Sequence, residues 1–169
     1  MPTIALINGH AFAGGLMLAM HHDYRIFNPS RGFLCLNELD FGYPLKPSMS
    51  SIFREKCPPL TYRSLVLEAK RFTAAEALAG GIVDGLGGLE EALGLVKERK
   101  LTEKGKSGIY GIMKREMYRE TFALMEGHDA LEVKDDEIRE SEMARIREME
   151  SRVEEWRRNS KDGNAKAKL

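Results

Sequence analysis

Apolar runs and helical patterns alternate along the first forty residues. Short runs rich in β-branched and apolar residues predict buried strands over 3–8, 23–28 and 32–38. Between the first two runs, residues 14–22 are apolar and predict a buried helix. The order strand, helix, strand, strand predicts an α/β fold.

The next sixty residues are mainly helical in pattern. Four prolines between residues 44 and 59 limit regular structure there, although 48–56 is compatible with a short helix. Residues 60–70 predict a helix. Thr73 is a predicted N-cap with Glu76 as its capping-box partner, and Gly80 and Gly81 end that helix. An amphipathic helix is predicted over 88–100.

The composition changes after Lys100, which predicts a separate C-terminal helical region over 101–158. Residues 101–108 are polar and loop-like, 109–127 are helical in pattern, and 131–158 are dense in alternating charge. Ile146, Met149, Val153 and Trp156 form a short heptad-like stripe. Such a stripe is compatible with a helix that packs one face against a core, or with one that packs against a partner helix. The polar tail, 159–169, is predicted to be disordered.

Composition excludes several classes of function. Lys and Arg (26) balance Asp and Glu (26), so no global attraction to nucleic acid or anionic membrane is expected. The longest apolar run, residues 11–20, is too short to span a bilayer, and no secretory signal is expected. Two cysteines provide no disulfide framework. His21 and His22 are adjacent on the predicted helix and cannot chelate together, so no metal is expected.

The small residues Ala13, Gly14 and Gly15 stand where the first helix begins. Bare backbone N–H groups at a helix N-terminus attract negative charge, and small residues let a ligand oxygen reach them. Tight packing of a turn is the alternative explanation for the same residues.

Three segments together resemble the crotonase superfamily, the enoyl-CoA hydratases and isomerases. They are "PTIALINGHAFAGGLMLAMHHDYRIF", "LNELDFGYP" and "FTAAEALAGGIVDGL", which occur in the order found in that family. The resemblance extends from Pro2 to Lys100 and implies a partial crotonase-like core over 1–100, followed by C-terminal helices. It also implies that an N-terminal portion of the family, with sheet strands and part of the coenzyme A site, is missing here.

The resemblance implies roles for two positions. Gly14 matches the residue whose backbone N–H holds the thioester oxygen in an oxyanion hole, where fixed donors stabilise the enolate. Glu38 matches the catalytic glutamate. Burying a carboxylate at the end of an apolar run costs free energy unless the group has a function or a partner. Apolar surroundings would also make the carboxylate a better base near neutral pH. An exposed Glu38 that caps the strand or pairs with an arginine is the alternative.

The position of a second glutamate separates hydration from isomerisation in that family. Here it is Met17, which cannot transfer a proton, so the resemblance favours a Δ3,Δ2-enoyl-CoA isomerase over an enoyl-CoA hydratase. Phe12, Ala13, Asn37 and Phe41 are, with Met17, the expected substrate-binding residues; Phe12, Met17 and Phe41 fit a plain core equally well. The substrate would be an acyl-CoA thioester, and no separate cofactor is expected.

The missing N-terminal portion leaves two interpretations open. With one oxyanion donor instead of two, the rate is expected to fall by roughly 10²–10³. The chain is therefore either an isomerase, read from a truncated sequence or with reduced efficiency, or a catalytically dead crotonase-like subunit that binds partners. The resemblance also implies a homo-trimer or hexamer.

The last three residues, Ala167, Lys168 and Leu169, resemble the Ser-Lys-Leu peroxisomal address. They predict a peroxisomal location and an import receptor as a partner. Chance occurrence of the tripeptide is the alternative.

Overall fold

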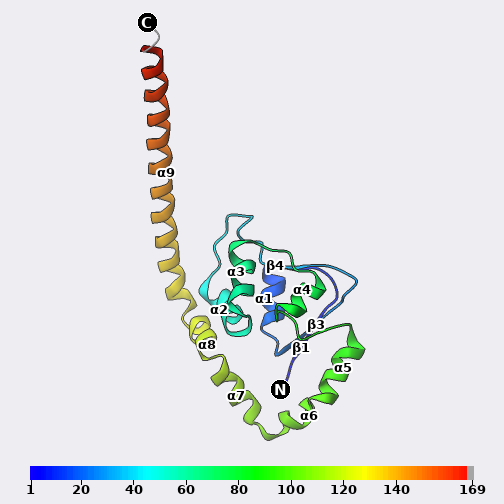
Figure 1. The fold of residues 1–169 in the computed structure, drawn as a ribbon. Helices are drawn as coiled ribbons and strands as arrows, with labels where there is room; N and C mark the ends of the chain where they lie inside the picture. Colours follow the sequence, from blue (N-terminus) through cyan, green and yellow to red (C-terminus); the bar gives the residue numbers. More distant parts are fainter. Residues whose placement is uncertain (167–169) are drawn as a thin grey trace. The chain divides into compact units, whose positions relative to one another are not determined.

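The computed structural model describes the backbone of residues 1–166 and the side chains of 1–129, 131 and 133–159. The chain divides into two compact units, Met1–His128 and the part from Asp129 onwards. The first unit holds all the described strands (Figure 1). Ala167, Lys168 and Leu169, the predicted targeting residues, lie outside the described residues.

Two small parallel sheets organise the first unit. In one, β1 (Ile4–Ile7) pairs with β3 (Tyr24–Phe27), which pairs with β5 (Gly85–Leu86). In the other, β2 (Ala11–Phe12) pairs with β4 (Leu34–Cys35). These strands with their helices confirm the predicted α/β class. The two-residue strands β2 and β5 were not predicted, because their partners lie far away in the sequence.

The core packs around α1 (Gly14–Met20), which Figure 1 draws in blue within the first unit. Leu16 and Met20 of this helix are fully buried with Phe27, Phe53 and other apolar residues. A smaller cluster lies between β3 and α5 (Leu89–Glu98), formed by Ile26, Ala92, Leu95 and Leu101. The helix predicted over 14–22 is confirmed, two residues shorter.

Three helices follow β4. They are α2 (Pro47–Lys56), α3 (Pro59–Leu67) and α4 (Ala74–Ala79). Two of the prolines that limit structure in this region begin α2 and α3, since a proline at the first helical position has no N–H to leave unsatisfied. Thr73 and Glu76 form the predicted capping box at the start of α4.

Residues 101–128 belong to the first unit, which differs from the predicted boundary at residue 100. They form α6 (Leu101–Lys104) and a 3-10 turn, η1 (Gly105–Ser107), where a loop was predicted, then α7 (Ile109–Met117) and α8 (Arg119–Glu126). Buried Thr121 of α8 donates to Ser51 Oγ of α2 at 2.9 Å, and its N–H donates to Glu55 Oε1 at 3.3 Å. These long-range polar contacts have no local sequence signal.

The second unit is the helix α9 (His128–Lys166) from Asp129 onwards. It includes the predicted helix over 131–158 and continues to Lys166, into the tail for which disorder was predicted. Ile146, Met149, Val153 and Trp156 are all exposed, with between 43% and 68% of each side chain accessible.

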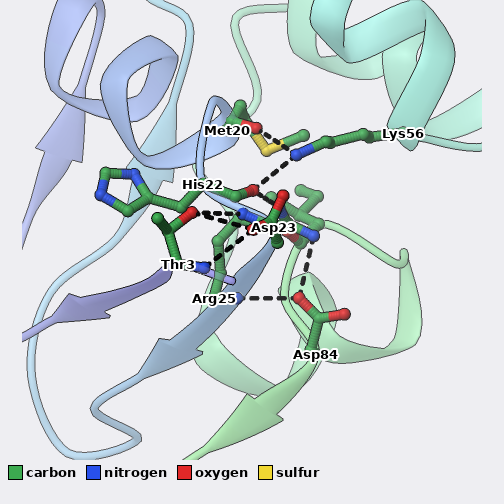
Figure 2. A network of polar contacts seen from close by, with 8 residues as sticks. Thr3, Met20, His22, Asp23, Arg25, Lys56 and Asp84 are labelled. Carbon is green, nitrogen blue, oxygen red and sulfur yellow. Dashed lines mark hydrogen bonds and ion pairs between the residues drawn. The ribbon is translucent and has the colours of Figure 1, made fainter. Parts of the chain in front are cut away.

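A polar network fixes the point where α1 ends and β3 begins (Figure 2). The Arg25 guanidinium, 4% exposed, donates to Ile82 O at 2.6 Å, His22 O at 3.0 Å and Asp84 Oδ2 at 2.9 Å. Asp23 accepts from the Thr3 N–H at 2.8 Å. The buried cation therefore has three partners that hold α1, β3 and the segment before β5 together.

Replacing Arg25 by methionine is expected to lower the free energy of unfolding by about 3–5 kcal/mol, because Asp84 and two buried carbonyls would lose their donor. Chemical denaturation monitored by circular dichroism measures this. The matched control is Arg63→Met, whose exposed pair with Glu68 spans 3.9 Å and should change stability by less than about 1 kcal/mol. Equal effects of the two variants would contradict the structural role of Arg25.

The capping box predicts an acid-dependent loss of stability. The Thr73 N–H donates to Glu76 Oε2 at 2.9 Å, and this bond, with those from Lys70 and the Thr73 hydroxyl, lowers the pKa of Glu76 from 4.5 to about 2. Because the folded pKa is depressed, the contribution is complete above the ordinary value of 4.5 and disappears as the pH falls to about 2. Glu76→Gln should lose less stability than the parent in an acid titration followed by circular dichroism, and equal losses in the two proteins would contradict this account.

Candidate active site

The candidate site is built at the carboxyl ends of two paired parallel strands. In the register of β2 and β4, Phe12 lies opposite Cys35, and the next N–H, of Ala13, donates to Cys35 O at 3.0 Å. Gly14 is the next residue after Ala13, and Glu38 lies three residues after Cys35. Both segments therefore leave the strand pair at the same end.

The turn from β2 into α1 is strained. Ala13 has φ 48° and ψ −125°, a conformation that costs a non-glycine residue about 1–3 kcal/mol. Its carbonyl accepts the first helical bonds, from Leu16 and Met17, both at 3.0 Å. Within residues 1–166, no acceptor contacts the Gly14 N–H, which leaves this donor at the exposed helix start available to a ligand oxygen.

Packing does not explain the glycines at this turn. A Cβ placed on Gly14 or Gly15 would meet no atom within 4 Å, and neither has a positive φ. Gly32 differs, because it has φ +97° and its Cβ would lie 2.3 Å from the carbonyl carbon of Gly9. Among the described residues, the space at Gly14 therefore remains open for a ligand.

Glu38 lies in a tight turn and is buried, 8% exposed. Its carbonyl accepts from the N–H groups of Phe41 at 3.1 Å and Tyr43 at 3.0 Å, which holds the residue in place. Its Oε2 atom and Oδ1 of the neighbouring Asn37 are buried without a hydrogen-bond partner in the described part of the chain. The alternative of an exposed, strand-capping Glu38 is thus wrong, and the structure presents an unpaired buried carboxyl oxygen.

The other predicted substrate-binding residues differ widely in burial. Met17 is buried in the core, 7% exposed, whereas Phe41 is 73% exposed. Phe12 is half-buried, with its ring 5.2 Å from that of His10 and 5.7 Å from the Arg71 guanidinium carbon. Neither His10 nor Arg71 was predicted as a neighbour of the site. Arg71 comes from a distant segment that precedes α4, so no local pattern points to it.

The cysteines and the possible metal ligands do not suggest another chemistry. Burial raises the pKa of the Cys35 thiol and raises that of Cys57 to about 11, so neither is an activated nucleophile. Within residues 1–166, no group of three or more histidine, cysteine or acidic side chains is placed to hold a metal ion. In the same range, none of the helices combines the length and apolarity needed to cross a membrane.

The chain belongs to the enoyl-CoA hydratase/isomerase family of the crotonase superfamily, whose family model matches residues 1–129. Enoyl-CoA delta isomerase 3 of Arabidopsis thaliana is 36% identical over 126 residues, which are 71% of this chain and 53% of that protein. The peroxisomal enoyl-CoA delta isomerase 1 of the same plant is 37% identical over 127 residues, 71% and 52% of the two chains. The chain therefore spans about half the length of these curated relatives.

Solved structures agree with the family fold. The enoyl-CoA hydratase structure from Mycobacterium ulcerans superposes with a TM-score of 0.65 at 23% identity, covering 78% of this chain and 58% of that one. A second hydratase structure, from Mycobacterium marinum, gives the same TM-score and identity over 78% and 59%. At this level of identity the likeness establishes the fold.

The open space at Gly14 predicts that substitution there is tolerated. Gly14→Ala should change the free energy of unfolding by less than about 1 kcal/mol, because a Cβ meets nothing and alanine favours a helix. Gly32→Ala should destabilise by more than about 2 kcal/mol through backbone clash and strain. Urea unfolding of both variants measures the contrast, and a large loss for Gly14→Ala would restore the packing explanation.

Proposed function

We propose that the chain carries the catalytic residues of a Δ3,Δ2-enoyl-CoA isomerase, which converts a 3-enoyl-CoA thioester into the conjugated 2-enoyl isomer in fatty-acid β-oxidation. The observation that carries the proposal is the unpaired, buried Glu38 carboxyl oxygen at the same end of the β2–β4 pair as the exposed Gly14 N–H. The names of the isomerase relatives support the substrate class.

Glu38 is the proposed proton shuttle. A carboxylate oxygen with no protein partner is available to accept a proton from C2 of the substrate and to return it at C4. Proton removal moves negative charge onto the thioester oxygen and gives a dienolate. One carboxyl group is sufficient, because the group that takes a proton from C2 can return one at C4.

The Gly14 N–H is the proposed donor to that oxygen. The donor is fixed in direction by α1, whose first bonds run from Leu16 and Met17 to Ala13 O. A pre-oriented donor stabilises the charge most in the transition state, where the oxygen is most negative. Gly14 and Glu38 thus have complementary tasks in the proposed reaction.

Met17 argues against hydration as the activity. Addition of water needs a second group that handles the water molecule, and the resemblance places that group at position 17. Met17 offers only a thioether, which neither accepts nor donates a proton, and its side chain is packed in the core. Isomerisation requires no such group.

The proposal extends to assembly and location. We expect a homo-trimer or hexamer, as the family resemblance implies. Two Arabidopsis relatives bear the word peroxisomal in their names, and the C-terminal tripeptide of this chain resembles a peroxisomal address. Both features favour a peroxisomal location with an import receptor as a partner.

The decisive test measures the formation of 2-enoyl-CoA from 3-enoyl-CoA by the full chain and by Glu38→Gln. The variant keeps the shape of the side chain and removes its basicity, so turnover should fall by at least about 10²-fold. Glu98→Gln, on the exposed end of α5, is the matched control and should retain activity. Undiminished turnover in Glu38→Gln, or no turnover in a folded parent chain, would overturn the proposal.

A further inference from the structure

One face of the small β2–β4 sheet carries aromatic and basic side chains that the proposed proton transfer does not use. Side chains alternate between the two faces of a strand, and residues opposite one another in the register share a face. Phe12 lies opposite Cys35 in the register of β2 and β4. His10 and Phe33, each two residues earlier in its segment, therefore lie on the same face as this pair.

A third segment brings Arg71 onto this face. Leu34 and Phe72 exchange both of their backbone hydrogen bonds, at 3.0 and 2.8 Å, in an antiparallel bridge. Arg71 precedes Phe72 and Cys35 follows Leu34, so Arg71 and Cys35 lie opposite one another. The Arg71 side chain reaches across the fully buried Cys35, and its guanidinium carbon lies 5.7 Å from the centroid of the Phe12 ring.

The rings of His10, Phe12 and Phe33 contact one another and form an aromatic platform. The His10 ring stacks on the Phe33 ring, with centroids 5.8 Å apart and planes at 28°, and meets the Phe12 ring edge-on at 5.2 Å. His10 Nδ1 accepts from the Phe33 N–H at 3.2 Å, which places the ring hydrogen on Nε2. His10 and Phe33 are exposed and Phe12 is half-buried, so the platform offers ring surface and one N–H donor to a ligand.

Two arginines lie next to the aromatic platform. Arg71 lies over Phe12, and Arg31 lies beside Gly9, where an added Cβ would be 4.0 Å from Arg31 Nε. Both arginines are exposed, and neither forms an ion pair or a hydrogen bond with any other residue that the structure describes. Their guanidinium donors are therefore available to an anion that lies on the platform.

We propose that the aromatic platform and its two arginines bind the nucleotide portion of the coenzyme A thioester, and that Arg71 sets the affinity for its phosphates. A guanidinium group binds phosphate oxygens through two parallel hydrogen bonds. Exposed ring faces stack with a nucleotide base, and His10 Nε2–H adds one donor. The choice of coenzyme A rests on the proposed function, whereas the affinity of this face for a nucleotide does not.

The position of the platform fits a ligand that also reaches the candidate active site. The thioester carbonyl carbon is bonded to C2 on one side and to sulfur on the other, so with C2 at Glu38 the pantetheine arm leaves away from Glu38. The platform begins at Phe12, two residues before Gly14, and extends to His10, no more than about 13 Å of extended chain from Gly14. The pantetheine arm is longer than this, so one molecule can place its oxygen at Gly14 and its nucleotide on the platform.

The test is isothermal titration calorimetry of the full chain with coenzyme A, with adenosine 3′,5′-bisphosphate as its nucleotide half, and with pantetheine. Arg71→Met keeps an apolar stem and removes the donors, so the affinity for coenzyme A and for the bisphosphate should fall at least about tenfold. Arg63→Met is the matched control, because Arg63 is an exposed arginine on α3, and it should bind as the parent does. Unchanged affinity in Arg71→Met, or no nucleotide binding by the parent, would overturn the proposal.

Two further measurements separate binding from a structural role of these residues. Arg71→Met should keep the parent's affinity for pantetheine, which lacks the nucleotide, and an equal loss for all three ligands would show a structural role and overturn the proposal. His10→Leu removes the Nε2 donor and should also weaken nucleotide binding; unchanged binding would place the nucleotide elsewhere.

The remaining outcomes concern other occupants and the proposed function. Self-association that Phe33→Ser abolishes, in a parent that binds no nucleotide, would identify a second copy of the chain as the occupant of the platform and overturn the proposal. Turnover is not the readout here. Nucleotide binding that depends on Arg71 without any isomerase turnover would therefore contradict the proposed function alone.

Discussion

The hydrogen bond from the Ala13 N–H to Cys35 O is the contact on which the candidate site depends. It extends the two-residue β2–β4 pair by one step and forces the chain into a strained turn before α1. Without this hydrogen bond, the segments that carry Gly14 and Glu38 would not be held together where they leave the strand pair. The parallel direction of the pair matters equally, because only parallel strands send both continuations to the same end.

The opposite end of α1 must be fixed as well, because a seven-residue helix has little stability of its own. Arg25 and Lys56 both donate to His22 O, and Lys56 also donates to Met20 O. Two cations at a helix C-terminus favour its dipole. The direction of the Gly14 N–H is therefore set by tertiary contacts at both ends of α1.

Local patterns in the sequence predicted the elements that have a local signal. The capping box of α4 depends on neighbouring residues, β1 is marked by its β-branched and apolar run although it pairs with the distant β3, and the buried Glu38 follows an apolar run. The pattern did not predict β2, the docking of Thr121 on Ser51, or the partners of Arg25 at Ile82 and Asp84, because each depends on residues far away in the chain. The sequence could place Glu38 in the site, but only the structure shows that its Oε2 has no protein partner.

Two energetic costs coincide at the end of the β2–β4 pair. Ala13 holds a conformation that glycine would adopt without strain, and the Glu38 carboxyl is buried with an unsatisfied oxygen. Either cost could be removed by one substitution that leaves the surrounding core unchanged. Both costs lie close to the hydrogen bond from Ala13 to Cys35 O, since Ala13 is its donor and Glu38 lies three residues after Cys35. Selection for stability alone would not keep both of them. Their coincidence supports the proposed role of this turn, since backbone strain and unsatisfied buried groups concentrate where a protein binds and reacts.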